Sequence, residues 1–235
     1  MPASTAKTFV LVHGAWHGGW GWVRVVERLR AKGHAVFAPT NTGLGERAHL
    51  LTPQVDASLH IADIVNLIKY EELSDIVLVG HSYGGCVISG VIEQVPDKIK
   101  ALVFVDAFIP DDGQSVLDLV QPAVADVIRA AQARGETTVP VRDAAAFNVN
   151  EKDRAWVDGL ANPQPIRTMT EKLKLTGARE RVPRTYVRAG DYPNVAFDAA
   201  LARARKEGWR TFEVPGGHDI MINAPDQLAE ILASS

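Results

Sequence analysis

The chain has 235 residues, 46% of them hydrophobic and 23% charged, which fits one globular domain and excludes a disordered or fibrous protein. A formal net charge of −3 gives no basic surplus for nucleic acid, and a single cysteine excludes an internal disulfide and a cysteine-based metal cluster. No apolar run approaches the length of a membrane span, and residues 1–7 show no export signal, so we expect a cytoplasmic protein without a membrane partner.

Short runs rich in β-branched and aromatic residues predict buried parallel strands. These runs are residues 8–12, 35–38, 76–79, 101–105, 185–187 and 211–214. Between several of them, helical periodicity covers residues 20–31, 59–70, 86–94, 197–206 and 225–233. This alternation predicts an α/β fold with a parallel sheet covered on both faces.

The stretch 110–182 interrupts the alternation, because it has no strong strand signal and is too long for an ordinary connection. Helical patterns run over residues 116–134, 151–160 and 166–175. We therefore expect residues 1–109 and 183–235 to form the core, and residues 110–182 to form a helical cap inserted over the site.

The first chemical motif is the run 80–84, Gly-His-Ser-Tyr-Gly, which follows a predicted strand and opens a predicted helix. The glycines allow a tight turn that holds Ser82 exposed, and the helix N-terminus favours negative charge nearby. This context predicts that Ser82 is a nucleophile rather than a helix cap. His81 is expected to be structural.

The second motif is the run 13–16, His-Gly-Ala-Trp, just after the first strand. Acyl transfer needs two N–H donors directed at the oxygen that becomes negative, and we expect them from Ala15 and Tyr83. The spacing of His13 and His17 would suit metal ligands on a helix, but this glycine-rich turn is a poor helix. We expect neither a metal nor a cofactor.

The third motif is Gly-Gly-His at 216–218, after the last predicted strand. A histidine on a flexible loop at the carboxyl end of a strand can reach Ser82 and accept its proton. His218 also follows the nucleophile in the chain, as a base does in this type of strand-turn-helix site. We therefore predict that His218 is the general base.

These motifs together resemble the small α/β-hydrolases of the plant methylesterase and hydroxynitrile lyase group and their bacterial relatives. The resemblance is carried by FVLVHGAWHGGW at 9–20, GHSYGG at 80–85 and Gly-His at 217–218. It implies an α/β-hydrolase fold with a six-stranded parallel sheet and a helical cap. It also implies cofactor-free hydrolysis of carboxylic esters, as in the carboxylesterases and pyrethroid hydrolases among the bacterial members.

The chain departs from the lyases at two positions. They carry a threonine where this chain has Gly14, and a lysine where it has Asp219. The lysine supplies the positive charge that stabilises cyanide, and an acidic residue there would oppose it. The resemblance therefore favours ester hydrolysis over cyanohydrin cleavage. Lyase or cofactor-free oxygenase chemistry on the same site, and a slow-turnover small-molecule receptor, are the alternatives.

Two aspartates are candidates for the acid that orients His218. Asp191 follows the penultimate strand, which is the usual position in this fold, although it comes closer to the strand end than the common spacing. Asp106 follows the strand 101–105, and some α/β-hydrolases take their acid from that strand. Both strands should lie between those that carry Ser82 and His218. Chain position favours Asp191 slightly and leaves Asp106 open.

The substrate is expected to be a small ester with apolar or aromatic parts. Gly14, Trp16, Tyr83 and Phe108 are candidates for the pocket. Trp20 and Trp22 are expected in the core, whereas Phe147, Trp156 and Met169 of the cap are candidates to close the pocket. The sequence leaves the oligomeric state open, a homodimer included.

Overall fold

A computed structural model describes residues 6–235; the first five residues, part of the segment inspected for an export signal, lie outside it. Six parallel strands form one sheet in the order β2-β1-β3-β4-β7-β8. They are β1 (Thr8–Val12), β2 (Ala35–Phe37), β3 (Ile76–His81), β4 (Ile99–Val105), β7 (Arg184–Ala189) and β8 (Arg210–Val214). The predicted strands are confirmed, and β4 and β7 lie between the strands that precede Ser82 and His218.

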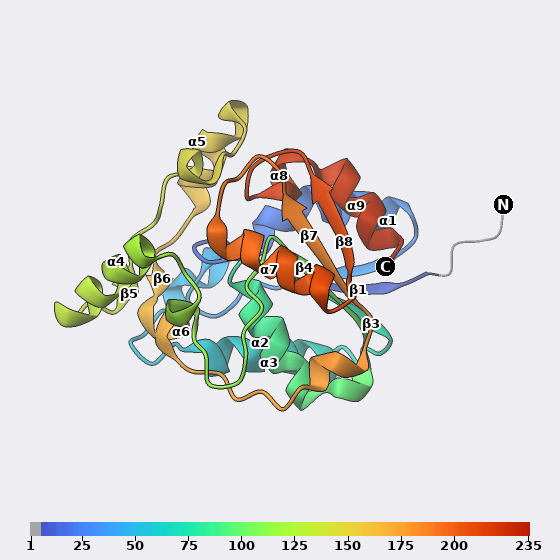
Figure 1. Ribbon diagram of the computed structural model, residues 1–235, viewed down its shortest axis with the longest axis horizontal. Helices are drawn as coiled ribbons and strands as arrows, with labels where there is room; N and C mark the ends of the chain where they lie inside the picture. The colour runs from blue at the N-terminus through green and yellow to red at the C-terminus, as the bar shows by residue number, and fades with distance from the viewer. Residues whose placement is uncertain (1–5) are drawn as a thin grey trace.

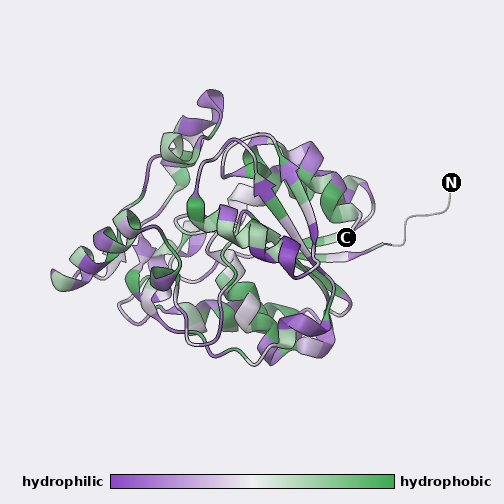
Figure 2. Ribbon diagram, viewed as in Figure 1, coloured by the Kyte–Doolittle hydropathy of each residue, from purple (hydrophilic) through white to green (hydrophobic). Residues whose placement is uncertain are grey.

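Helices cover both faces of this sheet (Figure 1). On one face α1 packs against α9, on the other α2 packs against α3, and α7 lies over β7 and β8. Figure 2 shows hydrophobic residues along much of α3, whose residues 84–92 are all buried. The helices of the core are α1 (Val23–Ala31), α2 (Ala57–Tyr70), α3 (Gly84–Gln94), α7 (Val195–Lys206), α8 (Ile220–Asn223) and α9 (Pro225–Ala233).

The segment 110–182 forms short helices beside the ends of the strands (Figure 1). Its helices are α4 (Pro122–Ala133), α5 (Glu151–Leu160) and α6 (Ile166–Thr170). Two short strands, β5 (Thr138–Val139) and β6 (Gln164–Pro165), pair in antiparallel fashion, which the sequence did not indicate. The helix expected over 116–134 begins later, because Pro122 occupies the first helical turn, where proline suits the unpaired N–H positions.

In the described residues, no helix is both long and apolar enough to cross a membrane.

Candidate active site

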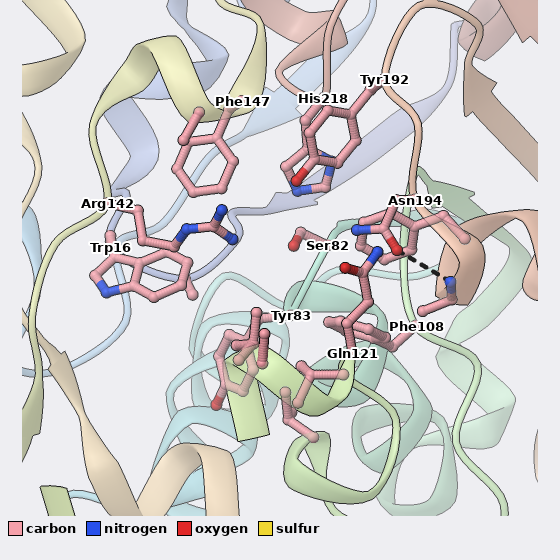
Figure 3. A pocket seen from close by; sticks show the side chains of 18 of the residues that line it. Trp16, Ser82, Tyr83, Phe108, Gln121, Arg142, Phe147, Tyr192, Asn194 and His218 are labelled. Carbon is pink, nitrogen blue, oxygen red and sulfur yellow. Dashed lines mark hydrogen bonds between the residues drawn. The ribbon is translucent and has the colours of Figure 1, made fainter. Parts of the chain in front are cut away.

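Ser82 lies on a strained turn between β3 and α3. Its backbone has φ of +53°, a left-handed conformation that residues other than glycine rarely adopt. The turn is held by bonds from the Ser82 N–H to the Val105 carbonyl (3.2 Å) and from the Phe108 N–H to the Ser82 carbonyl (3.2 Å). A Cβ on Gly80 would lie 2.5 Å from the Gly84 carbonyl oxygen, so the flanking glycines are required. The turn presents Ser82 to the pocket (Figure 3).

His218 and Asp106 form a buried hydrogen-bonded pair beside Ser82. The Nδ1 of His218 donates to the Asp106 carboxylate at 2.6 Å, and Asp106 is fully buried at the end of β4. Asp106 also has a left-handed backbone, with φ of +42°. Because Nδ1 is engaged with Asp106, the Nε2 of His218 remains free to accept a proton on the pocket side. Ser82 and His218 line the same cavity (Figure 3).

The slight preference for Asp191 as the partner of His218 is corrected by this geometry. Asp191 is exposed, and its carboxylate accepts a hydrogen bond from the Gly216 N–H at 2.7 Å. The Asp191 N–H in turn donates to the Gly216 carbonyl at 3.0 Å. Asp191 therefore braces the loop that carries His218, and its side chain does not reach the imidazole. Asp106, at the end of β4, reaches the imidazole instead.

Arg188 in β7 holds the far side of the Asp106 carboxylate. Its guanidinium donates to Asp106 at 2.7 Å, and to Asp198 at 2.8 Å, and only 4% of Arg188 is exposed. Burial opposes the charge of Arg188, but Asp106 and Asp198 outweigh it and raise the pKa of the guanidinium. The sequence interpretation missed Arg188. The available signal was a lone charged residue within the otherwise uncharged run 185–189.

Ala15 and Tyr83 both line the pocket. Within residues 6–235 neither N–H donates to a protein acceptor, so both can bind an oxygen of the substrate. The loop that carries Ala15 is fixed at the next residue, where Trp16 has φ of +66° and its N–H donates to the Gln164 side chain at 2.9 Å. His17 also donates from Nδ1 to the Ala15 carbonyl at 2.8 Å.

The cap segment contacts both loops of the site through its backbone. The Asn162 N–H donates to the Trp16 carbonyl, and the Phe147 carbonyl accepts from the His218 N–H, each at 2.9 Å. Together with Gln164, these contacts tie the cap to the Ala15 loop and to the His218 loop. Sequence periodicity carries no information on such contacts, and the role of Gln164 was not anticipated.

A second ionic pair, His17 and Asp219, is buried behind the site. The Nε2 of His17 donates to Asp219 at 3.1 Å, and both residues are almost fully buried. Burial opposes both charges, but each group stabilises the other, which raises the pKa of His17 and lowers that of Asp219. Burial, with His218 next in effect, lowers the pKa of His81 well below its usual value. His81 donates from Nε2 to the His218 carbonyl at 3.1 Å.

The residues best placed to hold a metal ion are His81, His218 and Asp219, whose ligand atoms lie within 4.8 Å of one another. These groups are already engaged, since His218 binds Asp106 and Asp219 binds His17. A metal at this position would remove His218 from its place beside Ser82. These three residues therefore fit a hydrogen-bonded network better than a metal centre.

The pocket is a cavity of about 330 Å³ that is lined both by residues of the segment 110–182 and by residues outside it. Trp16, Tyr83 and Phe108 line it, together with Phe147 and Met169 of the segment 110–182. Gly14 does not line it. A Cβ on Gly14 would lie 2.7 Å from the His81 Nδ1, so glycine serves the packing of the turn.

The remaining tryptophans lie outside the pocket lining. Trp22 is fully buried, as expected of a core residue, whereas Trp20 is only partly buried. Trp156, a candidate from the cap, packs edge-on against Trp20, with ring centroids 5.3 Å apart. Cys86 is buried in α3, and burial raises the pKa of its thiol to about 12, which agrees with a small packing residue.

A parallel sheet with a serine on a strained strand-to-helix turn, and a histidine on the loop after the last strand, defines the α/β-hydrolase class. The chain matches the model of the alpha/beta hydrolase family over residues 9–231, and it belongs to that family.

Known proteins of this class resemble the chain over different extents. A carbendazim hydrolyzing esterase of Nocardioides sp. (strain SG-4G) is 40% identical, covering 96% of this chain and 98% of that protein. Salicylic acid-binding protein 2 of Nicotiana tabacum is 40% identical over 45% of this chain and 41% of its own length. An extracellular α/β-hydrolase from a Paenibacillus species is similar in structure, with a TM-score of 0.85, 29% identity, and coverage of 97% and 98% of the two chains.

Proposed function

We propose that this protein is a serine esterase that cleaves small carboxylic esters through an acyl-enzyme formed on Ser82. The observation that carries the proposal is that Ser82 and His218 line one pocket while the buried Asp106 accepts a hydrogen bond from the His218 imidazole. A relative that is named as an esterase and matches the chain almost from end to end supports the same activity. We also propose cofactor-free chemistry and a cytoplasmic location.

In the proposed mechanism, His218 removes the proton from Ser82 as its oxygen attacks the ester carbonyl. Asp106 fixes the imidazole tautomer and stabilises the imidazolium that forms. The N–H groups of Ala15 and Tyr83 bind the negative oxygen of the tetrahedral intermediate. His218 then returns the proton to the leaving alcohol, and water releases the acid from Ser82 by the same steps.

Asp219 does not act against cyanohydrin cleavage through its charge. Asp219 does not line the pocket, and its charge is balanced by His17, so it does not repel an anion directly. The lyase lysine is nonetheless missing at this position, and Gly14 offers no hydroxyl. Esterase chemistry therefore remains the proposal for this site.

The first test is turnover of a panel of aryl and methyl esters, with mandelonitrile as the comparison substrate. We expect steady hydrolysis of small aromatic esters, because rings of Trp16, Phe108 and Phe147 line the cavity. Mandelonitrile should not break down above the background without enzyme. Tight binding of the esters without turnover would contradict the proposal and favour a receptor.

Replacing Arg188 with methionine should lower kcat on the order of a hundred-fold while KM changes little, because Asp106 and His218 would lose their fixed position. The variant should also be less stable by about 3–5 kcal/mol, since a buried carboxylate loses its partner. Steady-state kinetics and thermal unfolding measure the two effects.

Arg184→Met is the matched control, since Arg184 lies on the same strand and its nearest carboxylate is Glu207 at 3.9 Å. It should retain normal kcat. Arg188→Lys should recover part of the loss by restoring a cation beside Asp106. Full activity of a folded Arg188→Met variant would show that Arg188 does not position the acid.

A further inference from the structure

One positive charge lies in the wall of the pocket without a carboxylate to balance it. Arg142 lines the cavity from the cap, and no carboxylate of the residues described, 6–235, lies within 4 Å of its guanidinium. Within the described part of the chain, no aspartate or glutamate lines the cavity. The whole chain carries a net charge of −3, so this local positive charge does not follow from composition.

Aromatic rings hold Arg142 in position. Its guanidinium lies over the ring of Phe147, 5.2 Å from the centroid, and the same ring lies 5.6 Å from the imidazole of His218. Figure 3 shows the Arg142 side chain between Trp16 and Phe147, with the guanidinium directed toward the part of the pocket where Ser82 lies. Arg142 and His218 are therefore both neighbours of the Phe147 ring.

An arginine in open water contributes little to binding, because solvent screens its charge. Arg142 is itself exposed at the pocket wall, but a ligand that entered the pocket would cover its guanidinium together with the aromatic rings that line the cavity, which would strengthen its interaction with an anion. A carboxylate brought to this position would accept two parallel hydrogen bonds from the planar guanidinium. A neutral amide would accept at most weaker bonds, and an ammonium group would be repelled.

We propose that Arg142 forms an anion subsite, and that the preferred substrates are esters that carry a second, free carboxylate a few bonds from the scissile carbonyl. Half-esters of dicarboxylic acids have this chemistry. Water cleaves the ester bond to give the dicarboxylate, the alcohol and one proton that is released to solvent, while the carboxylate held by Arg142 is unchanged. The inference rests on the proposed esterase activity and specifies the class of ester.

The test compares two matched pairs of methyl esters. Monomethyl isophthalate is paired with methyl 3-carbamoylbenzoate, and monomethyl adipate with methyl 5-carbamoylpentanoate; within each pair only the charge of the distal group changes. We expect kcat/KM for the carboxylate to exceed that for the amide by about ten-fold or more in at least one pair, mainly through KM. Equal rates within both pairs would overturn the subsite.

The variant Arg142→Gln should remove most of this preference, and Arg142→Lys should keep part of it. Arg129→Gln is the control for net charge, since Arg129 is exposed on α4, pairs with Asp126 and does not line the pocket. It should keep the full preference. If the preference survives in Arg142→Gln, or disappears equally in Arg129→Gln, Arg142 is not the subsite.

A binding measurement separates this inference from the esterase proposal. Calorimetry with isophthalate and isophthalamide on the Ser82→Ala variant, with and without Arg142→Gln, needs no turnover. Preferential binding of isophthalate that depends on Arg142 supports the subsite even if no ester is hydrolysed, which would refute only the esterase proposal. Equal binding of the two ligands would overturn the subsite even if esters are hydrolysed.

Discussion

Replacing Ser82 with alanine should lower kcat for ester hydrolysis on the order of a million-fold, to the level that binding and the N–H donors alone provide. The fold should survive, because the Ser82 hydroxyl makes no hydrogen bond within residues 6–235 and the turn is held by its backbone. Steady-state kinetics with circular dichroism measures both outcomes.

Ser89→Ala is the matched control, since Ser89 is a buried serine of the following helix whose hydroxyl donates to the Gly85 carbonyl at 2.7 Å. It should retain normal kcat. A sulfonyl fluoride should label Ser82 in the native protein, as detected by peptide mass spectrometry. Labelling of another residue, with activity retained in Ser82→Ala, would refute the nucleophile.

Replacing Asp106 with asparagine should lower kcat about ten-thousand-fold, the second large effect that we expect. The amide would present an N–H where His218 needs an acceptor, so the wrong imidazole tautomer would be favoured. Arg188 would also lose the negative charge that it now contacts at 2.7 Å. Kinetics on the folded variant, with thermal unfolding as the check on stability, measures the effect.

Asp191→Asn is the comparison that decides which carboxylate acts. Asparagine retains a side-chain oxygen that can accept the hydrogen bond from the Gly216 N–H, so kcat should change little. If kcat falls strongly in Asp191→Asn and is nearly unchanged in Asp106→Asn, the assignment of Asp106 is wrong. If both variants are nearly normal, neither aspartate orients His218.

Most of the fold could be predicted from the sequence because the core follows a regular alternation of buried strands and amphipathic helices. The strand 8–12 and the helix 225–233 have the predicted bounds. In the cap, the helix 151–160 also has its predicted bounds, but the other two helices were less predictable, since tertiary contacts decide where they begin and end. α6 ends at Thr170, and the chain beyond it bonds to a distant loop through the Leu173 N–H and the Gln114 carbonyl.

The positions of Ser82 and His218 could be predicted because each belongs to a local motif with a defined strand context. The choice between Asp106 and Asp191 could not, because it depends on where a side chain points after a strand ends. Asp106 turns inward with a left-handed backbone, whereas Asp191 turns back to the adjacent loop. Arg142 and Gln164 were missed because each acts across a large sequence separation.

Asn162 and Gln164 of the cap bond to Trp16, and Phe147 of the cap bonds to His218. These three hydrogen bonds limit which changes in the cap are compatible with an intact site. Movement of the cap as a body would break the hydrogen bonds to both the Trp16 loop and the His218 loop. Substrate specificity can therefore change by substitution of cap side chains that do not make these hydrogen bonds, such as Arg142. If the whole cap were replaced by the cap of a relative, the hydrogen bond between Trp16 and Gln164 would have to be preserved to keep the catalytic loops in position.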